Sequence, residues 1–383
     1  MSEAARELAA LVAASSIRRV RVMAWRDLDD PEAGGSEMHM DSILSAWAAA
    51  GLRVDVRTSA VHGQASRIRR HGYFVERKGG RYQVFPQAIA RGIRYDRHHY
   101  DALVEIWNGV PFFGPLWFPG ARLTLIHHVH STMWKESIPG PLADLGWFIE
   151  HRVAPPLYRS GSVATLSSSG AAEIDELLGI SHAAVVPVGI SPFFSPGAER
   201  APEPLVVAVG RLVPVKHFDT LIREFAKVRA LVPTATFVIA GEGYLRPELE
   251  ALVAAQSATE WISLPGRISD DQLLDLYRRA WVVSSSSSRE GWGMSITEAA
   301  ACATPSVVVD IAGHRDAVDN GVSGILVKEG ESLADAIASL VTDPQRLDQL
   351  RRGALEFASR FSWDATALSL FKLLAADVAK RRS

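Results

Sequence analysis

The chain has 383 residues, which is longer than one hydrophobic core usually supports, so we expect two domains. Hydrophobic residues make up 48% and charged residues 22% of the sequence, as is typical of a soluble globular protein. The formal net charge of -2 excludes a general attraction to nucleic acid, and the single cysteine, Cys302, excludes an intramolecular disulfide bond.

We expect neither a membrane-spanning nor a secretory segment. No run of about 18 apolar residues occurs, and the apolar N-terminal stretch is interrupted by Glu3, Arg6 and Glu7. A lone cysteine also fits a reducing compartment. The sequence therefore indicates a cytoplasmic protein.

Short β-branched runs alternate with helix-length segments along the whole chain. In the first half, we predict strands at 18–25, 52–59, 100–108 and 121–129, and a helix at 36–51. In the second half, we predict strands at 205–212, 235–241, 261–266, 280–286 and 305–310, and helices at 218–231, 244–256, 269–280 and 295–303. This alternation predicts an α/β protein with two parallel sheets covered by helices.

The segment 187–205 is the expected domain boundary, because it carries five prolines and two glycines and no element of its own. We therefore predict one domain at 1–190 and a second at 191–365. The last helical stretch, 366–383, either completes the second domain or crosses back to the first.

Conspicuous polar residues follow the predicted strands, at the edge where open parallel sheets bind ligands. Gly34 and Gly35 precede a helix, so backbone N–H groups can approach an anion there, although such a pair also makes ordinary tight turns. Arg211 and Lys216 follow the first strand of the second half. A guanidinium and an ammonium group can together hold a diphosphate, and the alternative is two solvated loop charges.

Glu290 and Glu298 lie eight residues apart in the stretch "REGWGMSITEAAACATPSVV". The first precedes a Gly-Trp-Gly turn, and the second lies one turn inside a predicted helix. Both carboxylates are thereby placed around one helix N-terminus, which favours a pyrophosphate, and Glu298 can accept two vicinal hydroxyls such as those of a ribose. The alternative for Glu298 is a carboxylate that only stabilises the helix N-terminus.

With these motifs, the chain resembles the retaining glycosyltransferases of family 4. The resemblance rests on "VAVGRLVPVKHFDTL", on the Glu-x7-Glu pattern and on "GGSE", and it covers about residues 20–375. It implies the GT-B architecture, in which two Rossmann-like domains face a central cleft. It further implies a metal-independent hexosyltransferase of carbohydrate biosynthesis, without a cofactor, that moves a sugar from a nucleotide-diphosphate sugar to a hydroxyl of a glycan, glycolipid or small molecule.

The resemblance also implies two sets of site residues, and no metal ligand. The catalytic set consists of His127, Arg211, Lys216 and Glu290. The donor-binding set consists of Gly34, Gly35, Arg267, Ile268, Gly291, Trp292, Gly293, Met294, Ser295 and Glu298. As the histidine that approaches the sugar from the first domain, His127 is preferred over His128 and His130.

Within these sets, the implied roles follow the family. Arg211 and Lys216 stabilise the departing nucleoside diphosphate, and Glu298 binds the ribose hydroxyls. The glycine pair lines the phosphate and acceptor side, residues 267–268 flank the base, and Glu290 with the backbone of 291–295 cradles the transferred sugar. The first domain is then the acceptor side, and the second domain binds the donor.

The sequence departs from the family pattern in three places. His217 stands where a glycine commonly follows the lysine, and Ser295 and Thr297 replace apolar residues between the glutamates. In "AGHRDAV", Asp316 takes the place of a longer carboxylate. None of these removes a group that the reaction needs, but together they leave the donor open.

Metal binding is an alternative at two motifs. Asp27 and Asp29 form an Asp-x-Asp, and His127, His128 and His130 lie close together in sequence. We expect no metal at either, because the implied fold needs none.

Residues 67–97 combine nine basic and five aromatic residues with only two acidic ones. One interpretation is a surface that contacts an anionic membrane, at its inner face, or a phosphorylated acceptor. The interpretation we favour is a mobile, solvated, loop-rich insertion. No nucleic-acid partner is expected.

Two other functions fit the same motifs. A nucleotide-sugar epimerase of GT-B fold would use acid and base residues around the sugar without an acceptor. A catalytically silent nucleotide-sugar-binding protein would keep Arg211, Lys216 and Glu298 but release no nucleoside diphosphate. We expect the transferase, because it accounts for the motifs and for their order.

Overall fold

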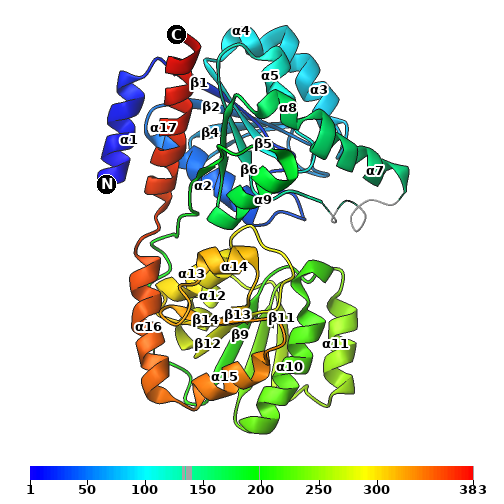
Figure 1. Cartoon of the computed structure of the whole chain (residues 1–383), viewed down its shortest axis with the longest axis vertical. Helices are drawn as coiled ribbons and strands as arrows, with labels where there is room; N and C mark the ends of the chain where they lie inside the picture. The colour runs from blue at the N-terminus through cyan, green and yellow to red at the C-terminus, as the bar shows by residue number, and fades with distance from the viewer. Residues whose placement is uncertain (132–133, 135–139, 198, 383) are drawn as a thin grey trace. The chain divides into compact units, whose positions relative to one another are not determined.

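The computed structural model describes residues 1–131, 134, 140–197 and 199–382, which divide into two compact units (Figure 1). Unit 1 comprises Met1–Gly189 and Trp363–Ser383, and unit 2 comprises Ile190–Ser362. Each unit is built around one largely parallel sheet, so the predicted α/β class with two parallel sheets is confirmed.

Unit 1 contains an eight-stranded sheet in the order β3-β4-β2-β1-β5-β6-β7-β8, in which only β3 and β4 pair in antiparallel fashion. Its strands are β1 (Arg19–Met23), β2 (Arg53–Thr58), β3 (Arg67–Arg70), β4 (Tyr73–Arg77), β5 (Ala102–Trp107), β6 (Ala121–Ile126), β7 (Ser162–Thr165) and β8 (Ala184–Val185). Every residue of β5 is buried, as expected for a central strand with helices on both faces.

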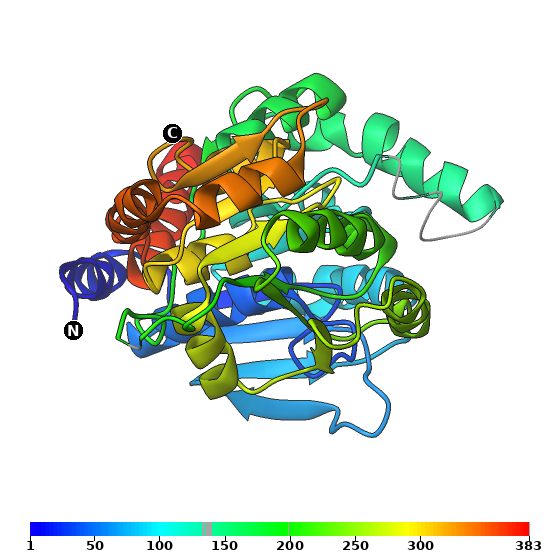
Figure 2. The same cartoon turned by 90° about the horizontal axis from the view of Figure 1, so that it is seen from below.

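Among the described residues, unit 1 has the helices α1 (Glu3–Ala14), α2 (Gly35–Ala49), α3 (Val84–Arg91), η1 (Gly92–Asp96), α4 (Arg97–His99), α5 (Gly114–Trp117), α7 (Pro141–Phe148), η2 (Ile149–Val153), α8 (Pro155–Tyr158), α9 (Ser168–Leu178) and α17 (Trp363–Arg382). α17 lies beside α1 in both views and also packs on α2 (Figure 1 and Figure 2). The Trp47 indole of α2 donates a hydrogen bond of 2.9 Å to the Ala367 carbonyl oxygen, which fixes α17 on unit 1.

Unit 2 contains a six-stranded parallel sheet in the order β11-β10-β9-β12-β13-β14. Its strands are β9 (Leu205–Val209), β10 (Thr236–Ala240), β11 (Ile262–Gly266), β12 (Val282–Ser285), β13 (Ser306–Val309) and β14 (Gly324–Val327). Its helices are η3 (Pro214–Lys216), α10 (Phe218–Leu231), α11 (Arg246–Ala255), α12 (Asp270–Arg279), α13 (Met294–Ala301), α14 (Ala312–Ala317), α15 (Leu333–Val341) and α16 (Pro344–Ala358). Their apolar faces form one core, in which Phe225 and Phe237 stack with ring centroids 4.1 Å apart.

The interpretation of residues 67–97 as a loop-rich insertion was wrong. The segment forms the hairpin β3–β4 and the helices α3, η1 and α4, and the hairpin extends the edge of the unit 1 sheet. The sequence suggested that the arginines of this segment lie on the surface. Some of them are buried instead, and Arg77 is only 3% exposed. Among the described residues, no helix combines the length and the apolar character that crossing a membrane requires.

Candidate functional site

The candidate site of unit 2 lies at the carboxyl ends of neighbouring strands. β9 is flanked by β10 and β12, and β13 follows β12, so the segments that leave β9, β12 and β13 emerge at one edge of the sheet. They are η3 with Lys216, the loop that carries Glu290, and α14. An open parallel sheet binds its ligands at this edge.

An ion pair joins two of these segments. Lys216 Nζ contacts Glu290 Oε1, and both side chains are partly exposed, at 21% and 16%. Ser287 Oγ donates a further hydrogen bond of 2.8 Å to the same carboxylate oxygen. Burial opposes ionisation of Glu290, but Lys216, His314 and Ser287 together hold the pKa of this carboxyl below its ordinary value. The site therefore presents a fixed carboxylate with a cation already bound to it.

Glu298 lies in α13 and is a carboxyl of a different kind. Its Oε2 accepts a hydrogen bond of 3.2 Å from the Tyr277 hydroxyl of α12. Burial raises the pKa of Glu298 to about 8, and the hydrogen bond from Tyr277 offsets only part of this effect. At neutral pH the carboxyl is therefore mostly protonated, so it can accept one hydrogen bond and donate another to a pair of ligand hydroxyls.

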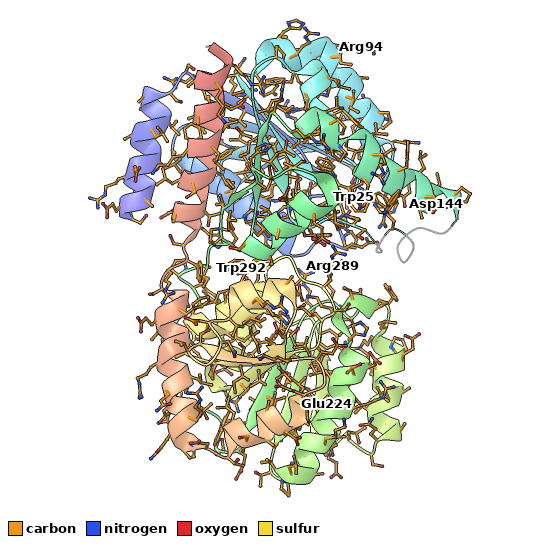
Figure 3. All side chains as sticks on the ribbon, viewed as in Figure 1. Trp25, Arg94, Asp144, Glu224, Arg289 and Trp292 are labelled. Carbon is orange, nitrogen blue, oxygen red and sulfur yellow. The ribbon has the colours of Figure 1, made fainter. Side chains whose placement is uncertain are left out.

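The turn before α13 brings backbone close to the site. Gly293, the residue before α13, has φ +106°, a conformation that favours glycine. Arg289 and Trp292 come from the same loop (Figure 3). The Trp292 side chain is 4% exposed and its indole packs edge-on against Phe361, so it anchors the loop with its ring turned into the unit. The first N–H groups of α13, beginning at Met294, have no partner within the helix ladder and suit an anion.

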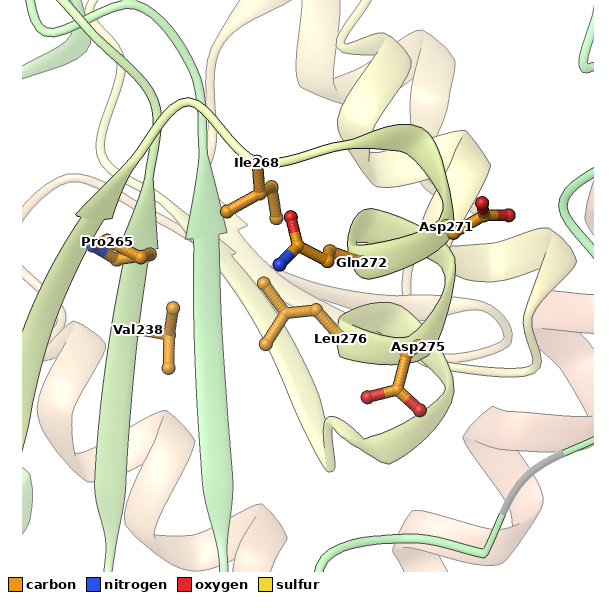
Figure 4. A pocket seen from close by; sticks show the side chains of 7 residues that line it. All are labelled: Val238, Pro265, Ile268, Asp271, Gln272, Asp275 and Leu276. Carbon is orange, nitrogen blue, oxygen red and sulfur yellow. The ribbon is translucent and has the colours of Figure 1, made fainter.

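Arg211 and Arg267 are both exposed on unit 2. Ile268 lines a pocket of about 400 Å³ between β10, β11 and α12 (Figure 4). The other lining residues are Val238, Pro265, Asp271, Gln272, Asp275 and Leu276. Ile268, Val238 and Leu276 give the pocket an apolar wall, and such a wall suits a flat ring such as a nucleobase.

His314 of α14 is a site residue that sequence reasoning missed. It is 0% exposed, and its imidazole is coupled electrostatically to Glu290 and Lys216. The neighbouring Gly313 packs closely against the loop that carries Glu290. A Cβ at position 313 would lie only 2.2 Å from the Glu290 carbonyl oxygen. In "AGHRDAV" the sequence pointed to Asp316, and nothing in the sequence alone indicated that the histidine two residues earlier interacts electrostatically with Glu290.

In unit 1, Gly34 and Gly35 stand at the start of α2, as the sequence predicted. The Gly34 N–H donates to Glu37 Oε2 at 2.8 Å, and Arg26 Nε lies 3.6 Å from the other oxygen of this carboxylate. The N-terminus of α2 is therefore already neutralised by a carboxylate of its own first turn.

His127 follows β6 and is paired with His39 of α2, with 3.1 Å between His127 Nε2 and His39 Nδ1. Burial lowers the pKa of His127, and His39 and His128 act in the same direction. Burial also lowers the pKa of His39 to about 3, so both rings are neutral near pH 7. Among the described residues, the buried His127 Nδ1 has no hydrogen-bond partner.

The other two histidines lie in the loop after His127. Their rings stack with centroids 4.9 Å apart, and the His130 N–H donates a hydrogen bond of 2.9 Å to the buried Glu150 of η2. His130 therefore has a structural anchor that the sequence did not indicate.

The two carboxylates of the Asp-x-Asp in unit 1 form ion pairs with arginines. Asp27 accepts hydrogen bonds of 2.7 and 3.0 Å from Arg77, and Asp29 lies 2.7 Å from Arg70. In the parts of the chain that the structure describes, no cluster of three or more His, Cys, Asp or Glu residues could hold a metal ion. Asp27 and Asp29 thus connect β1 to the hairpin β3–β4.

Two family models match consecutive parts of the chain. The model of the glycosyl transferases group 1 matches residues 190–357, and that of Glycosyltransferase Family 4 matches residues 33–192. A D-inositol 3-phosphate glycosyltransferase of Segniliparus rotundus is 31% identical over 276 residues, which are 63% of this chain and 59% of that protein. A protein of the same name from Salinispora tropica is 38% identical over 191 residues, 47% of this chain and 39% of that protein. The matches thus span between about two fifths and three fifths of these relatives.

Solved structures with similar folds are also found. A sucrose-phosphate synthase from Thermosynechococcus elongatus has a TM-score of 0.80 at 21% identity, over 95% of this chain and 100% of that chain. Anabaena HepE, solved in complex with UDP-glucose, has a TM-score of 0.73 at 18% identity, over 94% of this chain and 99% of that chain. At these identities the similarity concerns the fold.

Proposed function

Because the chain belongs to glycosyltransferase family 4 and has the GT-B fold, we propose that it transfers a sugar from a nucleotide-diphosphate sugar to an acceptor hydroxyl. The observation that carries the proposal is the Lys216–Glu290 ion pair beside the N-terminus of α13, with Glu298 in the same helix. It brings a cation, a carboxylate and free backbone N–H groups to one edge of the unit 2 sheet.

In the proposed reaction, Arg211 and Lys216 bind the diphosphate and stabilise the charge that develops as it leaves. Preorganised groups of this kind each contribute a factor of about 10²–10³ in rate. Glu298 holds the two ribose hydroxyls, and the pocket lined by Ile268 receives the base. Glu290 and the backbone of 291–295 hold the transferred sugar.

The acceptor hydroxyl attacks the anomeric carbon on the face that the diphosphate leaves, so the configuration of the sugar is retained. No metal takes part in the proposed steps, because the cationic side chains neutralise the diphosphate. In unit 1, we assign His127 and the glycine pair to the acceptor side. His127 Nδ1, which has no partner among the described residues, is the atom proposed to contact the sugar.

Two substrates are favoured as first probes. UDP-glucose is the ligand in the solved HepE complex, which supports a uridine diphosphate sugar as the donor. The name D-inositol 3-phosphate glycosyltransferase, shared by the relatives, supports a phosphorylated polyol as an acceptor. The proposal therefore begins with a UDP-sugar and D-inositol 3-phosphate.

Product analysis tests the proposal against its alternatives. The protein is incubated with UDP-glucose, and separately with GDP- and ADP-sugars, with and without D-inositol 3-phosphate and other polyol acceptors. A glycoside together with free nucleoside diphosphate supports transfer. An isomeric nucleotide sugar would instead support an epimerase, and binding without any product would support a silent binding protein. Glu298→Ala, which removes the hydrogen-bonding group, should lose the product, whereas Glu260→Gln, a change of an exposed glutamate before β11, should keep it.

A further inference from the structure

His314 has one ring nitrogen fixed and one left open. Its Nδ1 lies 2.7 Å from the Val309 carbonyl oxygen, and because a carbonyl only accepts, Nδ1 carries the hydrogen. In the neutral ring Nε2 is then a bare acceptor. Nε2 is fully buried and has no hydrogen-bond partner among the described residues. A buried nitrogen of this kind can gain a proton without any change in the Val309 contact.

The charged groups around this imidazole come from three segments. Glu290 and Lys216 belong to the ion pair of the site, and Asp310, just after β13, is the third group that couples to it. Asp310 is itself paired with Arg315 at 2.6 Å, and Glu298, the titratable residue of α13, is bonded to Tyr277. The Gly293 turn lies against the ring, since a Cβ there would come 3.7 Å from His314 Cδ2.

In the free protein the charge of Glu290 is neutralised without a proton on His314. Lys216 neutralises Glu290, and burial lowers the pKa of His314, which the Val309 contact and Glu290 offset only in part. The imidazole is therefore neutral near pH 7. Any event that takes Lys216 away from Glu290 leaves a partly buried carboxylate without its cation, and the imidazole that interacts electrostatically with this carboxylate has a bare nitrogen.

We propose that His314 is a positioning residue that takes up a proton from solvent when the donor diphosphate draws Lys216 away from Glu290. The inference rests on the proposed function, because it assigns Lys216 to the diphosphate. The protonated imidazole then replaces the ammonium as the cation that fixes Glu290. The carboxylate keeps its place beside the α13 turn through the reaction, while Lys216 is free to stabilise the leaving group.

The experiment is isothermal titration of the full chain with UDP-glucose, GDP-mannose and ADP-glucose in turn, near pH 6.5, in buffers of different ionisation enthalpy. Nucleotide sugars carry no phosphate that titrates in this range, so the buffer dependence of the heat counts protons bound by the protein. His314→Asn retains an amide N–H for Val309 but has no site for a proton. His182→Asn, a change of an exposed histidine that contacts the Gly161 carbonyl in unit 1, is the matched control.

We expect the wild type and His182→Asn to take up about half a proton or more per bound nucleotide sugar, relative to His314→Asn. Glu298 exchanges the same number of protons in the wild type and in His314→Asn. Subtracting the proton uptake of this variant from that of the wild type therefore removes the contribution of Glu298. Glu290→Gln should also abolish the uptake, because no carboxylate is then left bare, and it carries the test if His314→Asn fails to fold. His182→Asn and His314→Asn should bind the nucleotide sugar about as the wild type does, and Glu290→Gln should bind it more weakly, so this variant is titrated at a higher concentration.

Two results overturn the inference in distinguishable ways. If His314→Asn and Glu290→Gln bind with the same proton uptake as the wild type, the role of His314 is refuted and the proposed function stands. If none of the three nucleotide sugars binds the wild type, the proposed function falls, and the inference falls with it.

Discussion

Lys216 forms an ion pair with Glu290, 74 residues later in the chain, and thereby ties the segment after β9 to the segment after β12. Ser286 strengthens this connection, since its Oγ donates a hydrogen bond of 2.8 Å to the His217 carbonyl oxygen. The ammonium group is thus held at the strand ends before any ligand arrives. Preorganisation of this kind lowers the cost of stabilising charge in a transition state.

Replacing Lys216 with alanine should lower kcat for sugar transfer about 10²–10³-fold, because the departing diphosphate loses a fixed cation. Lys216→Arg should restore part of the rate, since the positive charge remains. The measurement is the release of nucleoside diphosphate in the presence of acceptor. Lys227→Ala removes an exposed lysine of α10 and should leave kcat unchanged. Equal rates in Lys216→Ala and the wild type would contradict the role of this lysine.

The raised pKa of Glu298 predicts how the stability of the protein changes with pH. Because burial raises the pKa of Glu298 to about 8 in the folded protein, the folded state binds more protons than the unfolded state between about pH 4.5 and 8. The contribution of this carboxyl is therefore fully present below pH 4.5 and is lost as the pH rises through 8. Its size is on the order of a few kcal/mol.

Glu298→Gln checks this prediction, because glutamine still accepts the Tyr277 hydrogen bond but cannot ionise. We measure the free energy of unfolding with denaturant at several pH values. Between pH 5 and 8 it should fall more steeply for the wild type than for the variant, so the variant becomes relatively more stable as the pH rises. A difference that stays constant over this range would show that Glu298 is not the group that titrates.

Gly313→Ala should weaken unit 2 and its site together. The new Cβ would lie 2.2 Å from the Glu290 carbonyl oxygen, so the loop before α13 has to move. We expect a loss of about 1–3 kcal/mol in the free energy of unfolding, with weaker binding of nucleotide sugar. Gly80→Ala, where the nearest atom lies 3.9 Å away, should be neutral in the same denaturation and titration measurements. Full stability in Gly313→Ala would refute the close packing.

The pairing of Asp27 with Arg77 predicts a structural role for the Asp-x-Asp. Asp27→Asn leaves a buried guanidinium without its full partner and should cost about 3–5 kcal/mol of stability. Asp30→Asn, outside this network, should cost little. Treatment with EDTA should leave the transfer rate and the stability of the wild type unchanged. A loss of rate that added Mg²⁺ or Mn²⁺ restores would support the metal-dependent alternative.

Much of the fold could be predicted from local patterns. The helix predicted at 218–231 has the same bounds as α10, because its apolar residues recur with helical period and Phe225 and Val228 are fully buried. The strands predicted in unit 2 likewise coincide with β9 to β13 within a few residues. Continuous β-branched runs are a strong signal where both faces of a strand are covered.

The hairpin β3–β4 was missed for a physical reason. "RIRR" is mostly basic and "YFVER" ends in two charged residues, and buried arginines are unexpected unless their partners are known. The partners Asp27 and Asp29 lie about 50 residues earlier, so only the fold reveals them.

The same limit applies to the site. The Glu290–Glu298 spacing predicted that both carboxyls belong to one helix start, which the bounds of α13 match. Partners that lower their pKa values, Tyr277 for Glu298 and Lys216 with His314 for Glu290, come from other elements through contacts that no local pattern encodes. The roles of these residues stay predictions until they are tested.

The most direct test of the central claim is a thermal-shift comparison of UDP, GDP, ADP and dTDP and their sugars, without metal, on the wild type and Glu298→Ala. A ligand at about 100 times its dissociation constant should add about 2.7 kcal/mol of stability. The account predicts that one nucleotide family stabilises the wild type and loses this effect in Glu298→Ala, while it keeps the effect in Glu260→Gln. If no nucleotide stabilises the wild type even at millimolar concentration, the donor site built from Arg211, Lys216 and Glu298 is contradicted.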